Sequence, residues 1–345
     1  MNKRYKYGGD SILRLTSSQK AAKASVEKKV DSGEYTFESV DCISCGGNHL
    51  ARLAERDRYG LKYHVKICEN CGLTFTSPRM SQESYKSFYE NEYRHLYNDG
   101  TKNLNTFFFN QYRKTTHIAS FLSQNGVRPD GLSILEVGCG AGGILQYFKD
   151  RGAKVTGLDL NDHYLEYGRS KGLNLQHGFI TDLGTEEKYD MVIYNHVMEH
   201  ILDPVEELRA VADRLVPAGL IYIEVPGIKA LKSYHYDFLR YLQNAHVFHF
   251  SSNTLINILE QAGFEVISAN DSVRVIARWK GGNPENAGKR DVTESDYESC
   301  LRYLKSAEKK RRTTGRILKV KNQALHMAIT VLDFFGIRKL YRRQS

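Results

Sequence analysis

The stretch that most constrains this fold is a cluster of glycines after an apolar run, Ile134-Leu135-Glu136-Val137-Gly138-Cys139-Gly140-Ala141-Gly142-Gly143. The apolar start indicates a strand, and residues 144–151 indicate a helix directly after the glycines. Glycine permits positive φ and lets the backbone approach a ligand, so this strand–loop–helix is typical of a nucleotide-binding turn. Asp159 ends a second apolar run, about twenty residues on, where an acid commonly holds a ribose diol.

The region around this loop alternates short apolar runs with helix-like segments, from 133–137 to 273–280. Such alternation predicts an α/β fold with a doubly wound, mainly parallel sheet and helices on both faces. Ligands in these folds bind beyond the carboxyl ends of the strands. Five residues of interest fall at those ends: Gly138, Gly140, Asp159, Asp182 and Asn195.

Four cysteines form a second feature, because Cys42 and Cys45 make one Cys-x-x-Cys pair and Cys68 and Cys71 make another. Two such pairs at this separation suit a tetrahedral Zn²⁺ site of four thiolates. Four cysteine ligands leave no open position for water, so the predicted metal is structural. The alternative is two redox pairs or incidental cysteines.

Charge is unevenly distributed along the 345 residues, whose net charge is +9. Residues 1–30 carry 8 Lys/Arg against 2 acids and residues 301–345 carry 13 against 2, so the middle holds 28 against 36. An acidic centre argues against a nucleic-acid groove across it. We find no apolar run of membrane-spanning length and no secretion signal, and therefore expect a reducing cytoplasmic setting.

The glycine loop resembles the first motif of the class I S-adenosylmethionine (SAM) methyltransferases, with Glu136 to Gly142 in the loop and Asp159 as the second-strand acid. The resemblance runs in order from about residue 105 to 280. It includes Gly178-Phe179-Ile180-Thr181-Asp182, the "xxVLEH"-like Asn195-His196-Val197-Met198-Glu199-His200, the "LkPGG"-like stretch 215–220 and the "FS…AGF"-like stretch 250–264. It implies a Rossmann-like sheet of seven strands, SAM as cofactor, and these cofactor-binding residues: Glu136, Gly138, Cys139, Gly140, Gly142, Asp159, Leu160, Thr181, Asp182, Asn195, His196 and His200.

The cysteine region resembles the N-terminal zinc module of a group of SAM methyltransferases associated with modified sugars and surface glycans. The matching residues are Cys71-Gly72-Leu73-Thr74-Phe75-Thr76-Ser77-Pro78-Arg79 for "CGLxFxxPR" and Phe88-Tyr89-Glu90-Asn91-Glu92-Tyr93 for "FYxxxY". This group includes sugar C-methyltransferases, whose extra C-terminal domain is longer than the tail here. The resemblance therefore implies a sugar acceptor methylated on oxygen in preference to carbon.

An oxygen or carbon acceptor must lose a proton, and histidine suits that task near neutral pH. His246, before Phe250-Ser251, resembles the second histidine of the "HEHxxYFS" motif, which is linked to acceptor deprotonation, although Asn244 and Ala245 replace the first His and the Glu. We predict His246 as the base, with Tyr234, His235 and His249 in the acceptor pocket. The alternative is a histidine that caps the helix near Ser251.

Two segments outside the catalytic core remain open to more than one interpretation. Tyr89 and Tyr93 fall on one helix face and line either an acceptor lid or a core. The apolar residues from Ile317 to Phe335 have helical spacing with basic residues beside them. That helix lies on an anionic membrane, on the protein's own surface or at a homodimer interface.

We therefore expect a cytoplasmic SAM-dependent methyltransferase, with peripheral contact at the inner face of the membrane as a further possibility. The predicted partner is a sugar of a nucleotide-linked or lipid-linked glycan, and no specific nucleic acid. The alternatives are a small-molecule methyltransferase acting on a quinone or natural product, and a non-catalytic SAM-fold binding module. The predicted parts are a basic flexible tail (1–38), a zinc ribbon (39–80), an aromatic helical linker or acceptor lid (81–125), the SAM-binding domain (126–282) and a linker with basic amphipathic helices (283–345).

Overall fold

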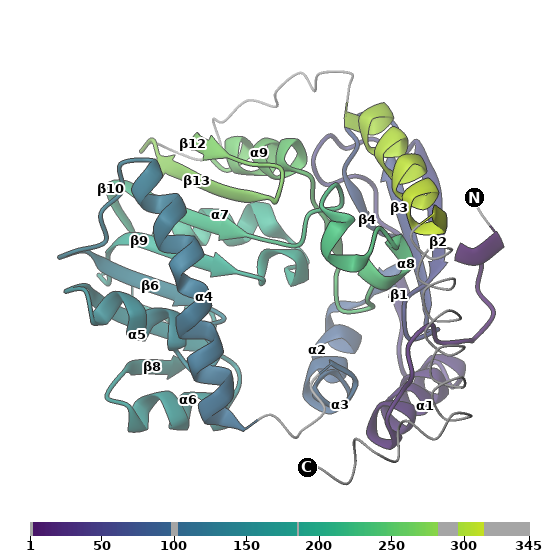
Figure 1. Ribbon diagram of the computed structural model, residues 1–345, viewed down its shortest axis with the longest axis horizontal. Coiled ribbons are helices and arrows are strands. Elements are labelled where there is room, and N and C mark those ends of the chain that lie inside the picture. Colours follow the sequence, from purple (N-terminus) through teal and green to yellow (C-terminus); the bar gives the residue numbers. More distant parts are fainter. Residues whose placement is uncertain (1–2, 98–102, 185, 282–295, 314–345) are drawn as a thin grey trace, which may run out of the picture.

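A computed structural model describes residues 3–97, 103–184, 186–281 and 296–313 of the chain. The described residues form a large sheet covered by helices and a smaller lobe beside it (Figure 1). The smaller lobe holds the two Cys-x-x-Cys pairs. Every helix in these ranges is too short or too polar to cross a bilayer.

The large sheet has seven strands in the order β12-β13-β10-β9-β6-β7-β8. Five of them pair in parallel, and β13 is antiparallel to both β10 and β12. This confirms the predicted mainly parallel, seven-stranded α/β sheet. The strands are β6 (Ser133–Val137), β7 (Lys154–Asp159), β8 (Asn174–His177), β9 (Tyr189–Asn195), β10 (Leu215–Glu224), β12 (Phe264–Ala269) and β13 (Arg274–Trp279).

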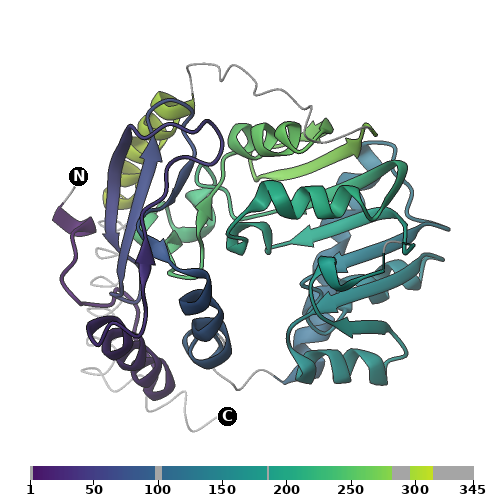
Figure 2. The same cartoon turned by 180° about the vertical axis from the view of Figure 1, so that it is seen from behind.

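Helices cover both faces of this sheet, because successive strand residues point to opposite sides. Ile134 packs with α4 (Leu104–Gln124), α5 (Gly143–Lys149) and α6 (Asp162–Ser170). Leu135 packs in the opposite core with α7 (Pro204–Ala212) and α9 (Ser252–Gln261). Figure 2 shows α7 and α9 on the face opposite α4.

The smaller lobe contains an antiparallel sheet of four strands in the order β11-β4-β3-β2. Its strands are β2 (Leu50–Arg56), β3 (Lys62–Cys68), β4 (Thr74–Thr76) and β11 (Phe248–His249), and β1 (Phe37–Glu38) pairs with β5 (Arg79–Met80). The lobe also holds α2 (Gln82–Asn91), α3 (Tyr93–Tyr97), η4 (Leu231–Tyr234) and α8 (Phe238–Tyr241). Residues 226–251 of the predicted 126–282 domain thus belong largely to this lobe, which the sequence-based boundary did not anticipate.

The N-terminal segment differs from the flexible tail predicted for residues 1–38. After η1 (Lys3–Tyr5), helix α1 (Ser17–Asp31) begins at a capping box in which Thr16 and Gln19 exchange hydrogen bonds. Its buried residues, Ala22 and Val26, lie in one core with Phe88 and Leu96, and α1 packs on α3. A short apolar stripe in a basic segment was too weak a signal to predict this packing.

The C-terminal region is described only as a helix over residues 296–313. It packs on the smaller lobe through buried Cys300 and Ala307 (Figure 1). Residues 296–298 are therefore helical, where the sequence suggested a linker. The predicted amphipathic helix from Ile317 to Phe335 lies outside the described residues.

Candidate active site

The glycine loop connects β6 to α5 and lies beside the carboxyl end of β7. The amides of Gly138 and Cys139 both donate to the carbonyl of Leu158, at 2.8 and 2.9 Å. Gly138, Gly140 and Gly142 have φ of 72°, 57° and 79°, which side chains disfavour. A Cβ on Gly142 would lie 2.6 Å from Leu173, so the turn also lacks the space for a side chain.

Asp159 joins the loop to the end of β7. Its carboxylate accepts from the amide of Gly140 at 2.7 Å and from the amide of Asn161 at 2.8 Å. Burial raises the pKa of Asp159, while these amide donors lower it in part. The acid predicted to hold a ribose therefore lies directly beside the glycine loop.

Glu136 is the second buried acid of the loop and is 1% exposed. Burial, followed by the nearby charge of Asp159, raises the pKa of Glu136 well above its usual range. Its Oε2 has no hydrogen-bond partner among the described residues. A ligand ammonium or hydroxyl would satisfy this oxygen, as the bound methionine part of SAM could.

Two apolar side chains are exposed beside these acids: Leu160, 44% exposed, follows β7, and Phe179, 56% exposed, follows β8. Exposed large apolar groups at a strand edge are typical of a ligand site and suit an adenine ring. Asp182 accepts from the Phe179 amide at 2.7 Å and ends η2 (Ile180–Asp182), with Thr181 exposed beside it. Phe179 was not among the predicted site residues, although its place after a strand end could have indicated it.

Helix α4 closes over the other side of the loop. The Gln111 side chain donates to the Cys139 carbonyl at 3.0 Å and accepts from the Gly143 amide at 3.3 Å. Phe107 stacks on Tyr164 of α6, with ring centroids 4.8 Å apart. Gln111 was not among the predicted site residues, because a lone polar residue in an aromatic helix carries no pattern of its own.

A polar cluster lies at the end of β9, the strand next to β6. His196 follows Asn195 at a φ of 59°, and Glu199 and His200 lie in η3 (Met198–His200). Nδ1 of His196 lies 3.7 Å from Oε1 of Glu199. Nε2 of His200 and Nε2 of His246 each lie 3.8 Å from the same oxygen.

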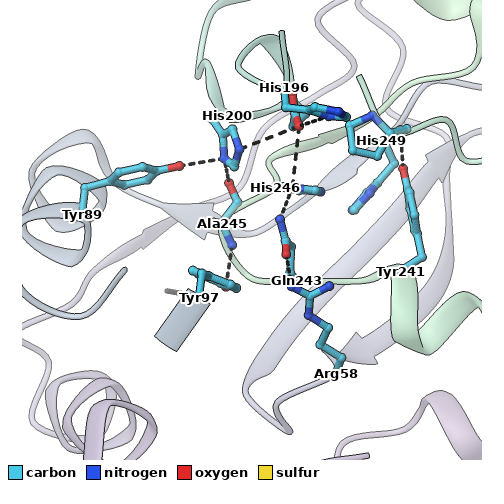
Figure 3. Close-up of polar contacts among 12 residues, drawn as sticks. Arg58, Tyr89, Tyr97, His196, His200, Tyr241, Gln243, Ala245, His246 and His249 are labelled. Carbon is cyan, nitrogen blue, oxygen red and sulfur yellow. Dashed lines mark hydrogen bonds and ion pairs between the residues drawn. The ribbon is translucent and has the colours of Figure 1, made fainter. Parts of the chain in front are cut away.

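His200 has a fixed orientation in this cluster. Its Nδ1 lies 2.8 Å from the carbonyl oxygen of Ala245 and 2.7 Å from the hydroxyl of Tyr89 (Figure 3). A carbonyl only accepts, so Nδ1 carries the proton and Nε2 presents its lone pair to Glu199. Tyr89 of α2 stacks on Tyr93 of α3 with ring centroids 4.4 Å apart, so the two tyrosines border the cluster but lie on successive helices, and the prediction of a single helix face was wrong.

The predicted base, His246, comes from the segment before β11 and is 4% exposed. Burial and the neighbouring His200 lower its pKa well below the usual histidine range. Ser251 and Thr254 cap α9, so the alternative of a cap by His246 is wrong.

The other predicted acceptor residues have different surroundings, and among them His249 lies beside His246, with ring centroids 6.2 Å apart. His249 donates to or accepts from the Tyr63 hydroxyl at 2.9 Å, and its fully buried ring has a pKa lowered to about 3 by desolvation. Tyr234 packs edge-on against Tyr241. His235 is exposed at the left-handed end of η4 and lies on the surface.

The four cysteines of the smaller lobe converge as their spacing predicts. Sγ of Cys42 lies 3.3 Å from Sγ of Cys71, and Sγ of Cys45 lies 3.5 Å from Sγ of Cys68. All four sulfur atoms lie within 4.8 Å of one another and none is in a disulfide.

Comparison with known proteins agrees with the site geometry. Residues 108–269 match the family model described as "Methyltransferase domain". The chain contains a SAM-dependent methyltransferase domain. The matched residues of this methyltransferase domain include the glycine loop, Asp159 and Glu199.

The curated relatives include a ubiquinone biosynthesis O-methyltransferase of Nitrosospira multiformis, 34% identical over 102 residues that cover 27% of this chain and 42% of that protein. The protein of the same name from Pasteurella multocida is 22% identical over 178 residues, covering 42% and 74%. The match thus spans less than half of the first relative's length.

The solved structures include a SAM-dependent methyltransferase from Mesorhizobium loti, 19% identical, with a TM-score of 0.39 over 46% of this chain and 96% of that one. An amino pentose methyltransferase from Micromonospora echinaspora is 18% identical, with a TM-score of 0.39 over 55% and 96%.

Proposed function

We propose that this protein transfers the methyl group of SAM to a hydroxyl oxygen of a small-molecule acceptor. One observation carries the proposal: the glycine loop with Asp159 and the cluster of Glu199, His200 and His246 lie at the carboxyl ends of neighbouring strands of one sheet. A methyl donor at the loop would therefore lie near groups able to handle the acceptor's proton.

The residues of the loop fit SAM. Leu160 and Phe179 would hold the adenine, Asp159 the ribose, and Glu136 the cationic methionine end. Bound SAM supplies a methyl on a sulfonium sulfur, so that a carbon–oxygen bond forms as the carbon–sulfur bond breaks and its electron pair stays on sulfur.

The polar cluster would remove the acceptor's proton. His246 is neutral near pH 7 because burial lowers its pKa, and a neutral imidazole can accept a proton. The Glu199 carboxylate, 3.8 Å away, would stabilise the imidazolium that forms. His249 and Tyr63 would brace the segment that carries His246.

The acceptor is a hydroxylated aromatic or quinol in this proposal, rather than the sugar that the sequence resemblance implied. The curated relatives are named ubiquinone biosynthesis O-methyltransferases, which favours this alternative. The half-buried Tyr89–Tyr93 stack beside His200 offers flat apolar surface for such a ring. Contact with a membrane surface, a homodimer and a cytoplasmic setting remain predictions.

We also propose that the four cysteines hold a structural Zn²⁺. A tetrahedral site with Zn–S bonds of about 2.3 Å places its sulfur atoms about 3.8 Å apart, and the thiols here are gathered within 4.8 Å. Two backbone hydrogen bonds close the turn that carries Cys42 and Cys45. The Cys42 amide donates to the Gly47 carbonyl, and the Gly46 amide donates to the Cys42 carbonyl. Four thiolates would close the coordination, so the ion's role would be to hold the lobe together.

The test is methyl transfer from radiolabelled SAM to a panel of catechols, hydroquinols and nucleotide sugars. The proposal predicts labelled aromatic ether, lost at least tenfold in His246→Gln and retained in His117→Gln, an exposed site on α4. Labelling of nucleotide sugars alone would overturn the aromatic acceptor. No labelling of any acceptor, despite SAM binding, would favour a non-catalytic SAM-fold module.

A further inference from the structure

The histidines at the end of β9 converge on a single carboxylate oxygen. Three ring nitrogens, from His196, His200 and His246, lie 3.7, 3.8 and 3.8 Å from Oε1 of Glu199. The ligand-type atoms of Glu199, His200 and His246 lie within 4.8 Å of one another. Direct hydrogen bonds are shorter than these distances, whereas ligands around a shared metal ion lie about 3–4 Å apart at bond lengths near 2.1 Å.

Two atoms of this cluster lack the partners that buried polar groups require. Glu199 is 1% exposed, and its Oε2 has no hydrogen-bond partner in the described part of the chain. Nδ1 of His246 is likewise buried without a partner. A buried carboxylate is costly unless a cation neutralises it, so the cluster is incomplete as a purely protein-made network.

The surrounding backbone fixes the ligand atoms in place. Nδ1 of His200 donates to the carbonyl of Ala245, which directs the Nε2 lone pair toward Glu199. The amide of Val247 donates to the carbonyl of Glu199 at 2.9 Å and ties the two ligand segments together. Histidine ligands commonly have their second ring nitrogen fixed by a carbonyl in this way.

We propose that Glu199, His200 and His246 bind a divalent transition-metal ion, with the fourth position on the side of His196. Two imidazoles and one carboxylate suit ions such as Zn²⁺, Fe²⁺ or Co²⁺. His196 is 52% exposed and its Nδ1 lies 3.7 Å from Oε1 of Glu199, so its ring marks the solvent side of the carboxylate. The ion keeps a position open there for an acceptor oxygen.

The catalytic consequence rests on the proposed function. An acceptor hydroxyl bound to the ion loses its proton to solvent more readily, because the cation stabilises the oxyanion. The oxyanion then takes the methyl group, and no oxidation or reduction occurs. When the ion is bound, His246 gives its lone pair to the ion, and the ion takes over the role that His246 has as a base in the metal-free site.

Gln243 is the competing partner for His246. Arg58 donates to the Gln243 side-chain oxygen, so the amide nitrogen faces Nε2 of His246 (Figure 3). A metal ion and this amide compete for one lone pair, and metal binding therefore turns the Gln243 side chain away.

Cobalt provides the test, because Co²⁺ bound to thiolates has an intense charge-transfer band and Co²⁺ bound to nitrogen and oxygen does not. Full-length protein that retains a single equivalent of zinc, for the four cysteines, is titrated with Co²⁺ and followed by calorimetry and absorption. We expect one equivalent of Co²⁺ without the thiolate band, weakened at least tenfold in Glu199→Gln and His246→Gln and unchanged in His117→Gln. SAM titration of the same samples should be unaffected, which separates this proposal from the cofactor site.

The proposal is overturned if all the Co²⁺ that wild-type protein binds shows the thiolate band. This result does not depend on whether the variants fold. It is also overturned if folded Glu199→Gln binds Co²⁺ as tightly as wild type.

Discussion

Phe248 of β11 pairs with Phe75 of β4 across antiparallel strands, with ring centroids 6.3 Å apart. A segment that precedes α9 thus completes the sheet that carries the cysteines. His249 lies in this strand and His246 lies two residues before it, so the cysteine lobe positions part of the candidate active site. The lobe is therefore an integral part of the fold and not an appended domain.

Substitution of one zinc ligand should destabilise this shared sheet. We expect Cys45→Ser to lose bound zinc and to lower the free energy of unfolding by about 3 kcal/mol or more, since metal binding contributes to folding. Metal analysis and urea denaturation measure both effects. Cys300→Ala, at a buried cysteine of the same lobe, should keep its zinc. Full zinc content in Cys45→Ser would contradict the four-cysteine site.

Gly143 should be intolerant of a side chain. A Cβ there would lie 2.2 Å from the carbonyl oxygen of Phe108 and 2.6 Å from Cβ of Gln111, so α4 would have to move off the loop. We expect Gly143→Ala to lower the free energy of unfolding by about 1–3 kcal/mol and to weaken SAM binding. Denaturation measures the first effect, and calorimetric titration measures the second. Gly184→Ala, where the nearest atom is 3.9 Å away, is the control. Equal behaviour of the two variants would contradict the packing of α4 on the loop.

His249 should make stability depend on pH. Its pKa is about 3 in the fold and 6.5 when unperturbed, so the unfolded chain binds the extra proton between these values. The contribution of a neutral His249 to the free energy of unfolding is therefore fully present above pH 6.5. It is lost as the pH falls, by about 2 kcal/mol at pH 5.

The matched variant is His249→Gln, which can keep a hydrogen bond to Tyr63 without titrating. Denaturation at pH 5.0 and 7.5 should show a smaller loss for His249→Gln than for wild type, whereas His117→Gln should match wild type. An unchanged pH dependence in His249→Gln would mean that this ring is not buried as a neutral group.

Asp296 anchors the helix of residues 296–313. Its carboxylate lies 2.5 Å from Nζ of Lys229 and accepts from Ser251 at 2.6 Å and Asn253 at 3.1 Å. Asp296→Ala leaves a lysine without its buried partner and should cost about 3–5 kcal/mol. Exposed Glu298→Ala should change stability by less than about 0.5 kcal/mol. If limited proteolysis cuts Asp296→Ala and Glu298→Ala no more readily than wild type, the helix does not depend on Asp296.

The central fold could be predicted from the sequence because its signals are local. The glycine loop, the Asp159 strand end and the alternating pattern each depend on neighbouring residues, and the cysteine spacing is equally local. The sequence could not show that residues 226–251 join the cysteine lobe, since β11 has two residues and pairs with a strand more than 170 positions away.

The candidate site shows the same division. Asp159 contacts the loop as its place at the end of β7 predicts, and Glu136 lies in the strand that leads into the loop. Gln111 was missed because it reaches the site only through tertiary packing, whereas the place of Phe179 after β8 was a local signal that could have indicated it. The pairing of Glu199 with His246 depends on a loop that returns across 47 residues, which no spacing rule specifies.

Cofactor binding at the glycine loop is tested by calorimetric titration of the purified protein with SAM and S-adenosylhomocysteine, repeated on Asp159→Ala. Asp159 accepts from the Gly140 amide, so its loss removes both the ribose contact and a support of the loop. Our expectation is micromolar binding by wild-type protein and at least a tenfold loss in Asp159→Ala. Absence of binding by folded, zinc-loaded wild-type protein would contradict it.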